Sequence, residues 1–278
     1  MAGDFFEHQV CHLTARILVQ LTNGATSIGT GFLYMTPIPS HPDRSVILLV
    51  SNKHVFSDPA GTLQISFNAK SASGEPDYGN VQTFRQDGFS TIYYQHPDDD
   101  VDLACVNISA ISGSNIYFKN LHDSFLEPID LDTIPPGSDV IFVGYPENRF
   151  DSKHNLPIIR KGSIASVPSV DFNGRPQIVI DAQVFQGSSG SPVFVVTGGH
   201  YRLLGVVSET MIRHAQLQTI PVGHPSLAVQ QILGLGIVIK QSKVVELITH
   251  TVDAVTALIA TPNPPLNSDA PASGAPVS

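Results

Sequence analysis

Two successive series of short apolar runs, separated by turn residues, constrain the fold of this chain more than any other feature. The first series is Leu13–Leu21, Gly31–Tyr34, Ser45–Val50, Leu63–Phe67, Gln82–Phe84 and Leu103–Ile108. The second is Asp139–Val143, Ile158–Ala165, Gln177–Ile180, Pro192–Val196, Leu203–Ser208 and Gly236–Ile239. Strands this short, with glycines and prolines scattered between them, favour antiparallel barrels over βαβ units. The pattern predicts an all-β fold of two six-stranded antiparallel barrels.

The same pattern divides the chain into units. We expect an N-terminal barrel over 10–115, a linker over 116–135 that contains Pro128 and Pro135, and a second barrel over 136–241. Apolar residues at three- and four-residue steps predict a C-terminal helix over 242–260, with Ser242 as its N-cap. The proline-rich segment 261–278 has little to bury, and we expect a disordered tail.

Composition excludes several classes of function. The formal net charge is −9, whereas nucleic-acid binding depends on Lys and Arg that neutralise phosphates, so no nucleic-acid partner is expected. No apolar run approaches the roughly 20 residues of a membrane-spanning helix, and no signal peptide is visible. Two cysteines cannot form a disulfide framework. We expect a cytoplasmic protein without membrane contact; the oligomeric state stays open.

A glycine-rich turn ahead of an apolar run is the sharpest local motif. In Gln186-Gly187-Ser188-Ser189-Gly190-Ser191-Pro192, glycines flank Ser189 on both sides. A serine nucleophile needs an exposed hydroxyl on a sharply turned backbone, and glycine allows the unusual dihedral angles and a close approach of the substrate. A flexible Gly/Ser loop would have a similar composition. The motif is not the Gly-x-Ser-x-Gly elbow of α/β-hydrolases, because Ser191 occupies the second glycine position.

A serine nucleophile needs a base and an orienting carboxylate. His54 follows a buried run, Ile47–Val50, at the point where small polar residues begin, so its imidazole is expected at the rim of a strand. Among the acidic residues 98–102, Asp102 opens an apolar strand and is the best placed for partial burial. A calcium loop over Asp98-x-Asp100-x-Asp102 is excluded, because Leu103 and Ser109 replace the required glycine and glutamate.

The order His54, Asp102, Ser189 is that of chymotrypsin, and over about residues 10–250 the chain resembles the trypsin-like serine endopeptidases. Its motifs are similar to those of bacterial single-domain members and of the HtrA-group protease domain, with no PDZ-sized region following. The matching motifs are Gly29-Thr30-Gly31-Phe32-Leu33, Ser51-Asn52-Lys53-His54-Val55, Asp102-Leu103-Ala104, Gly144-Tyr145-Pro146, Gly187-Ser188-Ser189-Gly190-Ser191-Pro192, Gly205-Val206-Val207-Ser208 and Gly236-Ile237-Val238-Ile239.

The resemblance implies roles for these residues. Ser189 would be the nucleophile, His54 the general base and acid, and Asp102 the orienting carboxylate. The backbone amides of Gly187 and Ser189 would form the oxyanion hole. Ser208 matches the serine that binds the aspartate, and Ser208, Glu209 and Thr210 match the edge that pairs with an extended protein or peptide substrate. The mechanism requires no cofactor and no metal.

Departures from the family pattern affect activation and specificity. Ser188 replaces the aspartate that pairs with a processed N-terminus in digestive trypsins, so activity would be intrinsic or gated by the loop over 183–188. Gln183 stands at the pocket floor and is uncharged, which removes the expectation of Arg or Lys before the scissile bond. Thr210 replaces a wall glycine, while Gly236 keeps the other wall open. We expect the substrate to carry a small or medium uncharged residue before the scissile bond.

Two other functions remain as alternatives. The first is a peptide-binding module with a protease fold and no turnover. The second is an esterase of the α/β-hydrolase class, which the missing elbow and the order of the three residues disfavour.

Overall fold

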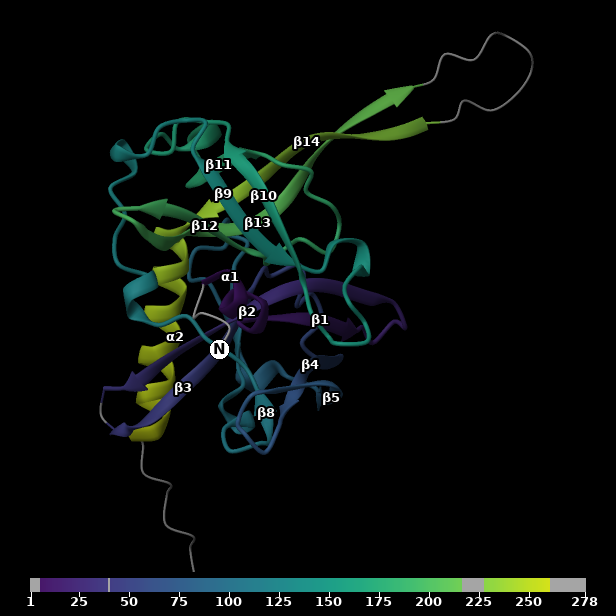
Figure 1. The fold of residues 1–278 in the computed structure, drawn as a ribbon, viewed down its shortest axis with the longest axis vertical. Coiled ribbons are helices and arrows are strands. Elements are labelled where there is room, and N and C mark those ends of the chain that lie inside the picture. The colour runs from purple at the N-terminus through teal and green to yellow at the C-terminus, as the bar shows by residue number, and fades with distance from the viewer. Residues whose placement is uncertain (1–5, 40, 217–227, 261–278) are drawn as a thin grey trace, which may run out of the picture.

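The protein consists mainly of two antiparallel β-structures and a C-terminal helix (Figure 1). This computed structural model describes residues 6–39, 41–216 and 228–260, with the backbone alone at 212–216, 228–232 and 260. The predicted all-β fold and C-terminal helix are confirmed. The strands of the first half are β1 (Thr14–Gln20), β2 (Thr26–Ile38), β3 (His41–Ser51), β4 (Thr62–Lys70), β5 (Pro76–Asp87), β6 (Tyr93–Gln95), β7 (Ala104–Asn107) and β8 (Ile116–Tyr117).

The first half forms one eight-stranded sheet in the order β5-β4-β1-β2-β3-β7-β6, with β8 paired to β4. The prediction of a closed six-stranded barrel was wrong in this half, since the sheet has two further short strands and its ends do not pair. Most side chains of β5 are exposed, so this edge strand has little apolar surface to bury by closing against β6. The sheet continues past the expected boundary at residue 115, because β8 belongs to it.

The second half forms a closed six-stranded barrel, as predicted, in the order β10-β11-β14-β13-β12-β9. Its strands are β9 (Asp139–Gly144), β10 (Ile158–Ile164), β11 (Gln177–Asp181), β12 (Pro192–Thr197), β13 (His200–Gln216) and β14 (Ala228–Lys240). The last two are much longer than predicted, and their paired ends extend as an arm away from the barrel (Figure 1).

The apolar run Val46–Val50 in β3 explains how the two halves pack. Side chains alternate across a strand, and both faces of β3 are buried. Ile47 and Leu49 pack inside the first sheet with residues such as Ile17. Val46, Leu48 and Val50 face a second core, which contains side chains of the barrel and of the C-terminal helix. A strand buried on both faces reads as a continuous apolar run.

The helices and turns complete the fold. Helix α2 (Gln241–Ala260) packs its apolar stripe, Val244, Leu247, Ile248 and Val255, into the core shared by both halves. No helix in the described part of the chain is long and apolar enough to span a bilayer. A short helix α1 (Phe6–Gln9) begins the described chain. The 3-10 helices are Val10–His12, Ser90–Ile92, Ser109–Ile111, Asp123–Phe125, Leu131–Thr133, Pro146–Asn148 and Phe172–Gly174. The predicted tail, 261–278, lies outside the described residues.

Candidate active site

His54 and Asp102 lie together at the ends of neighbouring strands. His54 follows β3 and Asp102 precedes β7, and these two strands pair side by side. The Asp102 carboxylate accepts twice from His54: Oδ2 lies 2.7 Å from Nδ1, and Oδ1 lies 3.1 Å from the backbone N. With Nδ1–H donating to a carboxylate, the neutral imidazole keeps its lone pair on Nε2. The side chains are 50% and 31% exposed, respectively, so a substrate can reach this imidazole.

Two further side chains hold Asp102. The Ser208 hydroxyl, from β13 of the barrel, donates to Oδ2 of Asp102 across 3.1 Å. Asn52 Nδ2 donates to the backbone carbonyl of Asp102 across 2.8 Å. Ser208 and Asn52 are both buried. The carboxylate is therefore fixed from both halves of the molecule.

Ser189 lies in the loop between β11 and β12, against the same Ser208. Its Oγ donates to the backbone carbonyl of Ser208 across 3.1 Å. Its own carbonyl accepts from the backbone N of Thr30, in β2, across 2.9 Å. No hydrogen bond joins Ser189 and His54 in the described structure. Ser208 therefore connects the two groups: its hydroxyl binds Asp102 and its carbonyl binds Ser189.

Glycine is required on both sides of Ser189. Gly187 and Gly190 have φ of 86° and 84°, in the left-handed region that favours glycine. A Cβ on Gly190 would lie 1.9 Å from the Thr30 carbonyl oxygen and 2.2 Å from Ser51 Oγ. A Cβ on Gly187 would lie 2.6 Å from the Tyr145 carbonyl oxygen. The glycine-rich motif is thus a closely packed turn and not a loose loop.

Two amides of this turn are left without an acceptor. The N–H groups of Ser188, Gly190 and Ser191 donate to backbone carbonyls at 2.8–3.0 Å. Those of Gly187 and Ser189 bind no acceptor among the residues that the structure describes. Two free N–H groups beside a serine hydroxyl can bind a negatively charged oxygen.

Contacts to the neighbouring loop orient the Gly187 amide. The carbonyl of Gln186 accepts from the backbone N of Glu147 across 2.5 Å. The peptide bonds are trans, so the N–H of Gly187 points in the opposite direction from that carbonyl, away from Glu147. The Thr30 hydroxyl donates to the Gly187 carbonyl across 2.9 Å and fixes the next peptide. The motif Gly29-Thr30-Gly31 marked Thr30 in the sequence, but nothing in the sequence indicated this contact.

The residues expected to line the substrate pocket differ in their exposure to solvent. Gln183 and Glu209 are exposed, while Gly236 is buried. In the ladder between β13 and β14, Thr210 pairs with Gly236. The Thr210 hydroxyl donates to the Val184 carbonyl across 3.0 Å, a contact that sequence reasoning missed.

A cavity of about 220 Å³ lies beside the candidate site, between the two halves of the molecule. Its lining includes Asp100 and Asp102 from the first half, and Arg175, Ser208 and Glu209 from the second. No group of three or more His, Cys, Asp or Glu side chains in the described residues is arranged to hold a metal ion.

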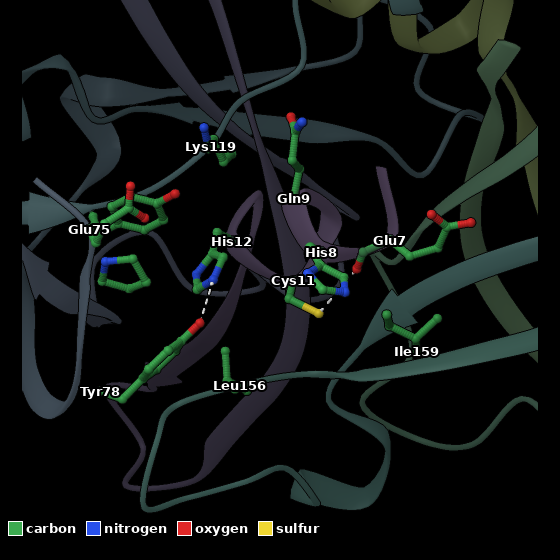
Figure 2. Close-up of a pocket in the computed structure, with 12 residues that line it drawn as sticks. Glu7, His8, Gln9, Cys11, His12, Glu75, Tyr78, Lys119, Leu156 and Ile159 are labelled. Carbon is green, nitrogen blue, oxygen red and sulfur yellow. Dashed lines mark hydrogen bonds between the residues drawn. The ribbon is translucent and has the colours of Figure 1, made fainter. Parts of the chain in front are cut away.

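A second cavity, of about 540 Å³, shares no lining residue with this site (Figure 2). Figure 2 shows His12 and Tyr78 facing each other across it, joined by a hydrogen bond of 3.2 Å between Nε2 and the phenol oxygen. Burial, together with the nearby Lys119 ammonium, lowers the pKa of His12 to about 4. His12 is therefore neutral at pH 7.

Comparison with known proteins places the chain in a family. A search of curated proteins finds no match to the chain. A family model described as a trypsin-like peptidase domain matches residues 29–206, more than half of the 278 residues. This range contains His54, Asp102 and Ser189, and it ends in β13. The chain therefore belongs to the family of trypsin-like peptidase domains.

Proposed function

We propose that the protein is a serine endopeptidase that cleaves peptide bonds through an acyl intermediate on Ser189. The observation that carries the proposal is the pair of contacts made by Ser208, whose hydroxyl binds Asp102 and whose carbonyl binds Ser189, each at 3.1 Å. These contacts connect the candidate nucleophile to the His54–Asp102 pair. Membership of a peptidase family supports the same reaction.

In the proposed reaction, His54 moves protons and Asp102 keeps it in the correct tautomer. Nδ1–H stays bonded to the carboxylate, and Nε2 removes the proton from Ser189 Oγ as this oxygen attacks the substrate carbonyl carbon. Nε2 then gives the proton to the amine as the peptide bond breaks. A water molecule loses a proton to Nε2, attacks the ester, and releases the acid while Ser189 recovers its hydroxyl proton.

The free amides of Gly187 and Ser189 would bind the oxygen that becomes negative in the attack. Each such donor is worth about 3 kcal/mol of the activation barrier. Because Gly187 is held by Thr30 and the Glu147 backbone before any substrate arrives, the hole needs no ordering during the reaction.

An extended peptide is the substrate class that fits these residues. We propose that the chain pairs as an added strand along Ser208, Glu209 and Thr210. The Ser208 carbonyl now accepts from Ser189, so a substrate N–H that binds this carbonyl competes for it. Substrate binding would then release the nucleophile toward His54.

The test is unbiased cleavage profiling of a peptide library by the wild type, by Ser189→Ala and by a matched control, Ser191→Ala. The Ser191 hydroxyl lies in the same turn, buried and with no hydrogen-bond partner among the described residues, so its loss should leave cleavage in place. The proposal predicts that wild type and Ser191→Ala cut the same peptides and that Ser189→Ala cuts none. Peptide capture without turnover by the wild type would instead support the binding module.

A further inference from the structure

The residue before the scissile bond should put its side chain between two segments of the barrel. Its carbonyl carbon must lie within reach of Ser189 Oγ, so its own side chain is only a few ångströms away. One neighbouring segment is the strand edge at Ser208–Thr210, whose first residue binds Ser189. The other is the segment 183–186, which leads into the Ser189 turn.

These two segments are joined to each other. The Thr210 Oγ1 donates to the Val184 carbonyl across 3.0 Å, so the Thr210 side chain spans the whole gap between them. A hydrogen bond of this length leaves no room for another group between its two atoms. Any side chain entering beyond this point must displace Thr210.

The deeper part of the same gap is also filled. Val184 is 1% exposed, and a Cβ added to Gly236 would lie 2.4 Å from its Cγ2. The space that Gly236 leaves open is therefore occupied by Val184. The cavities near the site agree with this: those lined by Ser208, Glu209 or Thr210 contain no residue of 183–186, and the one lined by Gln186 contains none of Ser208–Thr210.

We propose that Thr210 and Val184 close the primary specificity pocket, so that the enzyme cleaves after glycine, alanine or serine. This inference rests on the proposed endopeptidase function. A side chain the size of leucine or phenylalanine would have to break the Thr210–Val184 hydrogen bond and leave the buried Val184 carbonyl without its partner, which is costly. The side chains of glycine, alanine and serine stop short of it.

The experiment measures kcat/KM for a peptide series that differs only at the residue before the scissile bond, with Ala, Ser, Leu or Phe. For the wild type we expect a preference for Ala over Phe of about tenfold or more. Thr210→Gly should shift the ratio of Phe to Ala by about tenfold toward Phe. Thr210→Ser keeps the donor hydroxyl and should keep the preference for Ala. Thr210→Ala also removes the hydroxyl that bonds the Val184 carbonyl, and it should shift the ratio in the same direction as Thr210→Gly.

Two results would overturn this inference. One is a wild type that cleaves after Phe or Leu as fast as after Ala. The other is an unchanged ratio in folded Thr210→Gly and Thr210→Ala, with circular dichroism as the check of folding. If the wild type cleaves no peptide, the proposed function itself fails. Binding of the same peptides to Ser189→Ala, with and without Thr210→Gly, then tests the closed pocket alone, because binding needs no turnover.

Discussion

The backbone carbonyl of Ser208 accepts a hydrogen bond from the Ser189 hydroxyl across 3.1 Å, while the Ser208 side chain donates to Asp102. One residue of β13 thus restrains the nucleophile and also supports the carboxylate that orients the base. Replacing Ser208 by alanine separates these two effects, because the variant loses the hydroxyl that binds Asp102 but keeps the backbone carbonyl that binds Ser189.

Ser208→Ala should lower kcat by about tenfold. It removes one hydrogen bond to the ionised Asp102, and such bonds are worth about 1.5–3 kcal/mol when no solvent replaces them. Asp102 is 31% exposed, so water recovers part of that loss. Peptide turnover measures the effect, and KM should stay close to that of the wild type. An unchanged kcat would show that the hydroxyl does not support Asp102 in the reaction.

Asp102→Asn should lower kcat by about 10³–10⁴-fold with little loss of stability. The amide preserves the shape of the carboxylate but cannot accept from Nδ1–H if its NH₂ group faces His54, so the proton moves to Nε2 and the base is lost. Single-turnover kinetics at pH 7 and at high pH would measure the change. Activity within a few-fold of the wild type would contradict the role of Asp102.

Gly190→Ala should destabilise the fold far more than Gly74→Ala, although both glycines have nearly the same φ, 84° and 83°. A Cβ at Gly74 meets nothing within 4 Å, whereas at Gly190 it would overlap Thr30 and Ser51. Gly74→Ala carries only the backbone strain, about 1–2 kcal/mol. Gly190→Ala should cost about 3 kcal/mol more. Urea denaturation of the two variants checks this difference, and equal costs would refute it.

Acid should destabilise the protein through His12. The folded-state pKa of His12 is lowered to about 4 by burial and by Lys119, while the unfolded chain binds this proton near pH 6.5. The unfolded state therefore binds more protons in that window. The contribution of His12 to the free energy of unfolding is complete above about pH 6.5 and is lost as the pH falls toward 4.

His12→Gln tests the pH effect, because glutamine can still bond Tyr78 but does not titrate. The urea midpoint of this variant should fall less steeply between pH 6.5 and 4.5 than that of the wild type. Burial also lowers the pKa of His96, which faces Glu246, Lys243 and Asp98, so part of the slope should remain. Parallel slopes in the two proteins would exclude His12 as a source.

The strands could be predicted from sequence where burial leaves a pattern. The run Val46–Val50 is apolar because both faces of β3 are covered, and α2 begins one residue before its predicted start. Strands β6 and β8, of three and two residues, are too short to show any period. The extended β13–β14 arm was also missed. Its length depends on pairing between the two strands, and polar and apolar residues do not alternate regularly in its sequence over 210–216 and 228–233.

For the candidate site, residue types and spacing indicated which groups to examine, but not their contacts. The bond between Thr210 and Val184 joins residues 26 positions apart, and the register of β13 and β14 shifts just after Thr210, between Thr210 and Ile212. The contacts of Thr30 with Gly187 and Ser189 connect β2 to a loop more than 150 residues later. No local pattern encodes such contacts, because tertiary packing determines them.

Covalent labelling tests the central claim most directly. The purified protein is treated with a fluorophosphonate, and peptide mapping by mass spectrometry locates the adduct. We predict one adduct on Ser189 in the wild type and in Ser191→Ala, none in Ser189→Ala, and slow labelling in His54→Ala. An unlabelled Ser189 in the folded wild type, or labelling at the same rate without His54, would contradict the account.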